Sequence, residues 1–247
     1  MTIKAVVLAA GKGTRLQTEG EDLPKVMRRA LGRPLLHYVL EAISFIPPQD
    51  TIIVVGYGRD KVCEHFINYE FAHQKEQLGT GHAVMAAKDA LGQGDFPVLV
   101  CYGDMPLLGR ETYEDLVRLH LENQNTCTIL TGTTDLPLPF GRIIRDETGK
   151  FQKVVEDRDC SPEQKAIREL NVGVYVFQAQ TLLSALERLT PQNKQGEYYL
   201  TDVPAILRDE GRSIGICKRE LGDEIIGVNT VEQLKQVEDI LAVRCGR

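Results

Sequence analysis

The chain places the stretch IKAVVLAAGKGTR at residues 3–15, where an apolar run passes directly into two glycines. The run at 3–8 is almost continuously apolar, which predicts a strand that is covered on both faces. Small residues and glycines directly after a strand let backbone N–H groups approach an anion closely. Lys12 and Arg15 add positive charge at the same place. The stretch therefore predicts a strand followed by a loop that binds a triphosphate or pyrophosphate.

Outward from this stretch, short β-branched runs alternate with helix-like segments. In the first half we expect strands at 51–55 and 98–101 and helices at 35–46, 60–67, 83–91 and 111–121. In the second half we expect strands at 126–132, 142–145, 151–155 and 172–177 and helices at 162–168, 181–189, 200–208 and 231–243. Doubly covered strands separated by helices predict an α/β, Rossmann-like fold, with a mixed, mostly parallel sheet flanked by helices. No repeat or linker divides the chain, so we expect one domain over residues 1–247.

Composition excludes several classes of function. Lys and Arg number 29 against 35 Asp and Glu, a net charge of −6 without a basic block, which argues against nucleic-acid binding. No apolar run approaches the roughly 20 residues that span a bilayer, and no signal peptide is recognisable. The six cysteines form no CxxC pair and the five histidines no HxxxH. We therefore expect no membrane contact, no structural zinc site, and reduced thiols in the cytoplasm.

Two common phosphate motifs do not account for the glycines. The dinucleotide fingerprint needs a small residue where Leu16 stands, and the P-loop consensus is absent. A tight turn after the strand would explain two glycines without any ligand. A third cation, Lys25, follows Pro24, which restricts the backbone just before it and suits a side chain aimed at one point. The three cations together favour the phosphate-binding interpretation.

The runs LAAGKGTR (8–15) and LPK (23–25) resemble the signature of nucleotidyltransferases that act on sugar 1-phosphates. Later motifs narrow the resemblance to the uridylyltransferase domain of the bifunctional N-acetylglucosamine-1-phosphate uridylyltransferases, over nearly the whole chain. This resemblance implies the nucleotide-diphospho-sugar transferase fold, with a nucleotide-binding half at about 1–125 and a sugar-binding half at about 126–230. We find no counterpart of the acetyltransferase β-helix of those proteins, and expect a monomer or weak homodimer.

Nucleotide binding is implied for two segments. In the first loop the resemblance assigns it to Leu8, Ala10, Gly11, Lys12 and Gly13. The run QKEQLGTGH at 74–82 resembles a uracil-binding segment, in which Gln74, Gly79 and Thr80 read the base. Gly-Thr-Gly by itself could be a turn and helix cap. An amide and backbone groups can match the edge of a pyrimidine, and they reject a base that leaves them unpaired.

A buried strand ends in an acid within VLVCYGDMPL, residues 98–107. Ligands gather at the carboxyl ends of strands in open α/β sheets, although an aspartate in a turn before a proline is also common. A carboxylate next to a phosphate loop suits Mg²⁺. The resemblance assigns Mg²⁺ to Asp104 and to Asn229 in the GVN run at 227–229. Asn229 could instead cap the last helix.

The resemblance also assigns a sugar pocket in the second half. Its members are Tyr102, Gly141, Glu156, Asn171, Glu197, Tyr199 and Thr201. Taken separately, each position could be an ordinary turn, bend or helix start. Val172 stands where the family usually has threonine, which leaves the 2-substituent of the sugar open.

The implied reaction is UTP plus N-acetylglucosamine 1-phosphate giving UDP-N-acetylglucosamine, a cell wall precursor, and pyrophosphate. A phosphate oxygen attacks the α-phosphorus in line, so positioning and charge neutralisation supply the catalysis. Arg15 is implied to hold the triphosphate and Lys25 the attacking phosphate. The segment 16–22 is longer than in the family and acidic, and we expect it to be solvated.

Two alternatives stay open at this point. The same chemistry could act on another sugar 1-phosphate, such as glucose or galactosamine 1-phosphate. A non-catalytic sugar-nucleotide-binding module could use the same fold, although it would not need the charges of Arg15, Lys25 and Asp104. A glycosyltransferase would normally show an Asp-x-Asp motif at the strand end, where this chain has none.

Overall fold

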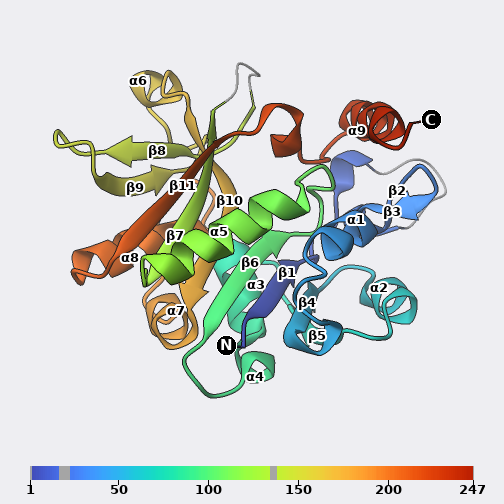
Figure 1. Ribbon diagram of the computed structural model, residues 1–247, viewed down its shortest axis with the longest axis horizontal. Helices are drawn as coiled ribbons and strands as arrows, with labels where there is room; N and C mark the ends of the chain where they lie inside the picture. The colour runs from blue at the N-terminus through green and yellow to red at the C-terminus, as the bar shows by residue number, and fades with distance from the viewer. Residues whose placement is uncertain (1, 17–22, 134–137, 247) are drawn as a thin grey trace.

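A computed structural model describes residues 2–16, 23–133 and 138–246 of the chain. In these ranges nine strands form one mixed sheet with helices on both faces (Figure 1). The strands of this sheet are β1 (Lys4–Leu8), β4 (Thr51–Val55), β5 (Glu70–His73), β6 (Pro97–Tyr102), β7 (Cys127–Thr133), β8 (Arg142–Arg145), β9 (Phe151–Val155), β10 (Glu169–Gln178) and β11 (Ile214–Glu220). A separate small sheet pairs β2 (Arg29–Ala30) with β3 (Arg33–Pro34).

The helices connect and cover these strands. They are α1 (Leu35–Ala42), α2 (Arg59–His65), α3 (Thr80–Ala86), α4 (Lys88–Leu91), α5 (Arg110–Glu122), α6 (Pro162–Lys165), α7 (Ala179–Leu186), α8 (Val203–Asp209) and α9 (Val231–Arg244). Short 3-10 turns occupy Thr14–Leu16, Lys25–Met27, Pro48–Asp50, Leu200–Asp202 and Gly222–Ile225. Within the described ranges, no helix is long and apolar enough to cross a membrane.

The main sheet runs in the order β11-β7-β10-β6-β1-β4-β5, with β8 on β10 and β9 on β8. Strand β1 pairs in parallel with both β4 and β6, and β4 pairs in parallel with β5. Strand β10 runs antiparallel between β6 and β7 and makes the sheet mixed. The predicted α/β fold is confirmed, and the parallel neighbours β1 and β6 end at the same edge of the sheet.

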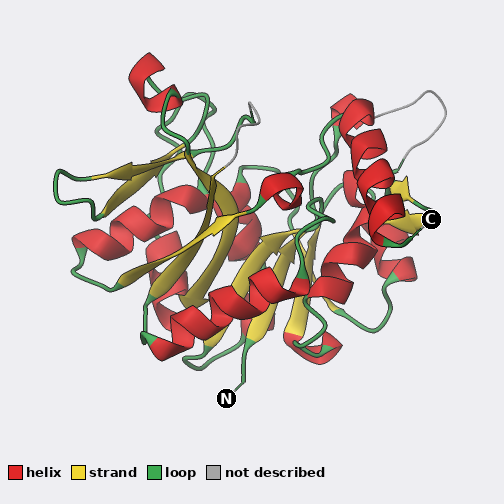
Figure 2. Cartoon of the chain, turned by 45° about the horizontal axis from the view of Figure 1, so that its top comes forward, coloured by secondary structure: helices red, strands yellow, loops and turns green. Residues whose placement is uncertain are grey.

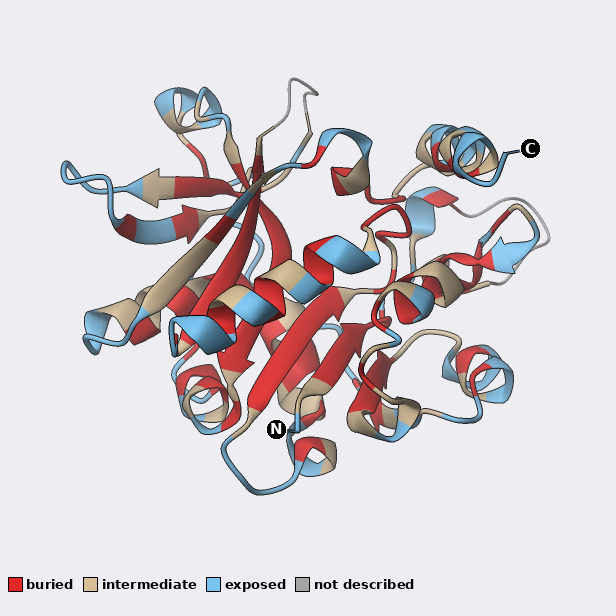
Figure 3. Cartoon of the chain, viewed as in Figure 1, coloured by how far each residue is buried: buried red, intermediate tan, exposed pale blue. Residues whose placement is uncertain are grey.

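Two apolar cores, one on each face, explain why β1 shows no alternation. Val7 packs into a cluster with residues of α1 and α5, and Val6 packs into a cluster with residues of α3, α7 and α8. Figure 2 shows helices on both sides of the sheet, and Figure 3 shows the strands buried between helices whose outer faces are exposed. Both faces of the strand are therefore covered, as its sequence predicts.

Several elements differ from the sequence prediction. Strands β5 and β11 were not expected, because both lie at the edges of the sheet and carry exposed polar residues in place of an apolar run. Strand β10 begins at Glu169, so Asn171 lies in a strand and not in a bend. The helix expected at 83–91 is divided into α3 and α4, and the segment at 200–208 begins as a 3-10 turn.

All six cysteines have free thiols, and four of them are buried. Burial raises the pKa of Cys101 to about 12 and also raises the pKa of Cys127. Buried thiols with raised pKa values carry little thiolate and react slowly. These cysteines therefore belong to the core.

The fully buried His120 of α5 predicts an acid-dependent loss of stability. Its Nδ1 lies 3.0 Å from Thr128 Oγ1, and burial lowers its pKa from 6.5 to about 4. Between these values the unfolded chain takes up a proton that the folded chain does not, so stability falls as the pH falls through this window. We expect His120 to make the protein about 2 kcal/mol less stable at pH 5 than at pH 7.

Urea unfolding of wild type and of His120→Gln at the two pH values measures this contribution. The variant removes the imidazole, so the difference in pH dependence between the two proteins isolates His120 from the other titrating groups. Equal pH dependence in both proteins would show that His120 is not held neutral.

Candidate active site

Backbone hydrogen bonds bring three distant segments together at the carboxyl ends of β1 and β6. Leu8 pairs with Tyr102 in the sheet, and Gly103 N donates to Leu8 O at 3.0 Å. Val228 N donates to Asp104 O at 2.9 Å, which fixes the segment before α9 against the end of β6. Asp104 and Asn229 therefore lie side by side, although they are far apart in sequence.

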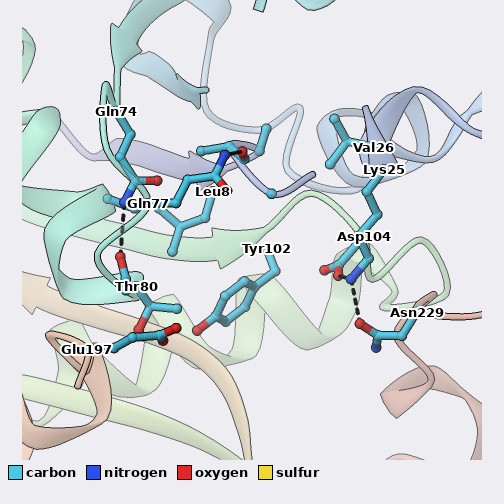
Figure 4. Close-up of a pocket in the computed structure, with 15 residues that line it drawn as sticks. Leu8, Lys25, Val26, Gln74, Gln77, Thr80, Tyr102, Asp104, Glu197 and Asn229 are labelled. Carbon is cyan, nitrogen blue, oxygen red and sulfur yellow. Dashed lines mark hydrogen bonds and ion pairs between the residues drawn. The ribbon is translucent and has the colours of Figure 1, made fainter. Parts of the chain in front are cut away.

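Lys25 lies between these two side chains (Figure 4). Its Nζ forms an ion pair with Asp104 Oδ2 and donates to Asn229 Oδ1 at 2.7 Å. The side chains of Lys25 and Asp104 are 14% and 18% exposed, so the charges are only partly solvated and attract each other more strongly than a surface pair. Of the residues assigned to catalysis and to Mg²⁺, which are Arg15, Lys25, Asp104 and Asn229, the structure brings the last three together.

Two cavities adjoin this contact. The larger of the two, which we call the larger cavity, has a volume of about 380 Å³. It is lined by Leu8, Ala9, Ala10, Gly11, Lys25, Val26, Gln74, Gln77, Gly79, Thr80, Ala83, Tyr102, Asp104, Glu197 and Asn229. Six residues that the sequence assigns to the nucleotide are in this set. Gln77 is a lining residue that the sequence analysis did not select, although it lies inside the run 74–82. Its Nε2 donates to Ala10 O at 2.8 Å and joins that run to the first loop.

A second cavity of about 170 Å³, the smaller cavity, lies on the other side of the same side chains. It is lined by Tyr102, Asp104, Met105, Pro139, Phe140, Gly141, Glu156, Asn171, Val172, Gly173, Gly227 and Asn229. Four residues that the sequence assigns to the sugar are in this set. The larger and smaller cavities share Tyr102, Asp104 and Asn229, which we call the shared wall. Ligands in the two cavities would meet there.

The first-loop cations lie outside both cavities. Arg15 is exposed at the turn Thr14–Leu16, and it is not among the described residues that line either cavity. Lys12 Nζ lies 5.0 Å from the centre of the Tyr57 ring, a cation–π contact. Of the predicted acidic segment 16–22, residues 17–22 lie outside the described residues. Among the described residues of the first half, Lys25 is therefore the cation that contacts the shared wall.

Three other predicted residues also line neither cavity. Gly13 packs against Lys25 and lines neither cavity. The buried Tyr199 hydroxyl accepts a hydrogen bond from Gln195 Nε2 at 2.6 Å. Thr201 is 2% exposed, and its hydroxyl has no partner of hydrogen-bonding geometry, although it lies near the Glu156 carboxyl, whose pKa is raised by burial in spite of this neighbour. Tyr199 and Thr201 are thus buried outside the smaller cavity, and Glu197, which was assigned to the sugar, lines the larger cavity.

Glu156 gives the smaller cavity an acceptor in a partly buried setting. Burial raises the pKa of its carboxyl, and the neighbouring acids Asp202, Asp159 and Asp157 raise it further. Burial, and then the charge of Glu156, also raises the pKa of Tyr102. Asn171 Oδ1 accepts from Tyr175 Oη at 3.0 Å, which leaves the amide nitrogen to donate to a ligand. Acceptors and donors of this kind suit the hydroxyl groups of a sugar.

The oxygens of Asp104 and Asn229 are suited to a divalent metal ion. Both already converge on one cation, the Lys25 ammonium. Carboxylate and amide oxygens are hard ligands, and Mg²⁺ usually takes one or two protein ligands and completes its shell with waters and substrate phosphates. In the part of the chain that the structure describes, no group of three or more His, Cys, Asp or Glu side chains could hold a metal. The donor set therefore fits Mg²⁺ that is held jointly with a phosphate ligand.

Gly13→Ala should lower turnover at least tenfold without unfolding the protein. Gly13 has a φ of +65°, and a Cβ at this position would lie 2.6 Å from Lys25 Cβ. The methyl group must therefore displace Lys25 from the shared wall, and misplacement of about 1 Å can reduce catalysis a hundredfold.

Gly32→Ala is the matched control for steady-state turnover and thermal unfolding. Gly32 has a similar φ of +82°, but a Cβ there would meet nothing within 4 Å. The control shares the backbone strain and lacks the clash. Equal turnover in the two variants would mean that the Gly13 contact does not position Lys25.

Comparison with known proteins gives concordant results. Residues 4–221 match the nucleotidyl transferase family. The chain is 40% identical over 248 residues to the bifunctional protein GlmU of Streptococcus thermophilus, covering 100% of this chain and 53% of that protein. It is 39% identical to the bifunctional protein GlmU of Clostridioides difficile, covering 99% and 52%. The chain thus spans about half the length of these relatives. A UDP-glucose pyrophosphorylase complexed with UDP-glucose has the same fold, with a TM-score of 0.74 at 19% identity, covering 99% of this chain and 100% of that one.

Proposed function

Because the chain belongs to the nucleotidyl transferase family, we propose that it transfers a uridylyl group from UTP to N-acetylglucosamine 1-phosphate and releases pyrophosphate. The similarity to GlmU over the whole chain supports this choice of substrates. The observation that carries the proposal is the shared wall, where one carboxylate and one amide border two adjoining cavities and both contact the Lys25 ammonium. A nucleotide in one cavity and a sugar phosphate in the other would present their phosphates to the same groups.

UTP is assigned to the larger cavity. Its base would lie against Gln74, Gly79 and Thr80, and its phosphates against the loop around Gly11. A Cβ at Gly11 would meet nothing within 4 Å, so open space faces this part of the backbone. Backbone N–H groups in such a loop bind phosphates well. Arg15, which is exposed nearby, would close on the triphosphate from the solvent side.

The sugar phosphate is assigned to the smaller cavity. Glu156 and Asn171 would hold hydroxyl groups of the ring, and Gly141 would let the ring approach the backbone. Met105, Phe140 and Val172 give the cavity an apolar side, which suits the methyl group of an N-acetyl substituent. Val172 replaces a hydroxyl with a methyl group and so strengthens this apolar character.

Charge neutralisation is the main task of the shared wall, because the two substrates repel each other. Asp104 and Asn229 would hold Mg²⁺, which when bound neutralises phosphate charge and orients the reacting groups. Lys25 adds a second positive charge and binds the attacking phosphate. This phosphate is already ionised at neutral pH, so the reaction needs no side-chain base. We place the reaction in the cytoplasm, where the free thiols stay reduced.

Release of pyrophosphate, measured for a panel of nucleoside triphosphates against a panel of sugar 1-phosphates, tests this function. We expect the highest kcat/KM for UTP with N-acetylglucosamine 1-phosphate. Equal rates with glucose 1-phosphate or galactosamine 1-phosphate would contradict the sugar assignment. No pyrophosphate release with any pair would favour a module that binds sugar nucleotides without catalysis.

A further inference from the structure

The side chain of Gln74 has a fixed orientation at the base end of the larger cavity. Gln74 is 4% exposed and follows β5, where its backbone N donates to Val55 O at 2.8 Å. Its side-chain Nε2 lies 3.1 Å from Gly79 O and 3.2 Å from His82 Nδ1. A backbone carbonyl can only accept, so the atom that faces Gly79 is the amide nitrogen and not the oxygen. Both amide hydrogens of Gln74 are thus directed to groups of the protein.

This orientation leaves the Gln74 side-chain oxygen for the base. Figure 4 shows the oxygen turned away from the contact that the amide nitrogen makes with the segment before Thr80. An acceptor at this point matches the N3–H donor of uracil. It opposes the N3 of cytosine, which is itself an acceptor. A Gln74 that turned its nitrogen outward would have the opposite preference.

We propose that His82 is a positioning residue that selects uracil over cytosine by holding the amide of Gln74 in this orientation. The inference rests on the proposed function, because it assumes that the base occupies this end of the larger cavity. The amide nitrogen of Gln74 can only donate, so His82 Nδ1 is the acceptor of this contact. His82 itself does not line the larger cavity, and it acts on the base only through Gln74.

A single acceptor leaves the side-chain amide of Gln74 free to rotate, whereas two acceptors hold it in one orientation. With Gly79 O alone, the amide of Gln74 could pivot about a single hydrogen bond and turn its second N–H toward the base. That N–H would then be a donor, which the N3 of cytosine accepts and the N3–H of uracil does not. With His82 present, the same rotation would break a hydrogen bond in a partly buried place, which disfavours it.

The backbone fixes both acceptors. Gly79 has a φ of +112°, and a Cβ there would lie 2.6 Å from Tyr198 O, so only glycine allows the carbonyl this direction. His82 lies in the first turn of α3, whose Gly81 N donates to Tyr198 O at 2.8 Å. The Tyr198 ring lies 6.4 Å from the His82 ring. The loop around Tyr198 therefore holds both partners of the Gln74 amide.

Calorimetric Kd values for UTP and CTP, measured on wild type and His82 variants, test the proposal. In His82→Leu we expect the preference for UTP to fall at least about fivefold, mainly through weaker UTP binding. In His82→Gln, whose side-chain oxygen can accept the same hydrogen, we expect the preference to stay within about twofold of wild type. His73→Leu is the matched control, since His73 contacts Arg59 and lines neither cavity, and its preference should not change.

Each outcome separates this inference from the proposed function. A wild type without preference for UTP would contradict the proposed function. A wild type that prefers UTP, with His82→Leu keeping the full preference, would overturn the role of His82 alone. Equal weakening of UTP and CTP in both His82 variants would also overturn it, because it indicates a merely structural residue. If His82→Leu does not fold, His82→Lys, which can only donate, is expected to lose the preference in the same way.

Discussion

Asp104→Asn should reduce kcat for pyrophosphate release by about a thousandfold while the protein stays folded. The substitution keeps the shape of the side chain and removes its charge from the shared wall. The amide would bind Mg²⁺ and attract the Lys25 ammonium far more weakly than the carboxylate does, so two anionic substrates would meet with less compensation. The backbone contacts of residue 104 do not involve its side chain, so the position of the segment before α9 should persist.

The measurement for Asp104→Asn is steady-state kinetics over a series of Mg²⁺ concentrations, with thermal unfolding as a check of the fold. Asp209→Asn changes the net charge equally at an exposed residue that pairs with Arg208, and it should be close to wild type. An Asp104→Asn enzyme with a kcat within tenfold of wild type, and the same Mg²⁺ dependence, would refute the assignment of Asp104.

Lys25→Met should reduce kcat by about a hundredfold and change the Kd of UTP by less than about threefold. Its Nζ contacts Asp104 and Asn229, which line both cavities, so it acts where the attacking phosphate meets the nucleotide. Methionine keeps the unbranched stem against Gly13 and removes only the charge. We expect Lys25→Arg to recover little of the lost kcat, because a planar guanidinium does not replace a compact ammonium between Asp104 and Asn229.

Single-turnover kinetics and calorimetric UTP binding separate these two effects for Lys25→Met. Lys88→Met removes a lysine that pairs with Glu187 on the surface, and it controls for net charge. A large loss of UTP affinity with an unchanged rate of the chemical step would mean that Lys25 binds the nucleotide and not the attacking phosphate.

Much of the fold could be predicted from the sequence because its central strands are covered on both faces. Residues 3–8, 51–55 and 98–101 carry apolar side chains on both sides, and the structure places each in the parallel part of the sheet. The edge strands β5 and β11 could not be found in this way, since one neighbour and partial exposure leave no apolar run. Apolar runs therefore predict strands best where the strand is buried on both faces.

The candidate site could be predicted only in part. Short runs of sequence pointed to Gln74, Asp104 and Asn229, which line the cavities, but also to Lys12, Gly13 and Arg15, which line neither. The contact of Lys25 with Asp104 and Asn229 depends on chain segments that approach only after folding. The contact between Gln74 and His82 depends on the turn at Gly79, which no periodicity reveals. Which side chains share a wall is a property of the fold and not of any single motif.

The transfer of label from UTP tests most directly whether the shared wall joins a nucleotide to a sugar phosphate. UTP labelled with ³²P at the α-phosphorus or at the γ-phosphorus is incubated with N-acetylglucosamine 1-phosphate and Mg²⁺, and the products are separated. We predict that the α label appears in the nucleotide sugar and the γ label in pyrophosphate, in equal amounts. Recovery of the γ label as inorganic phosphate, or of the α label in UMP without a sugar nucleotide, would contradict the attack on the α-phosphorus at this wall.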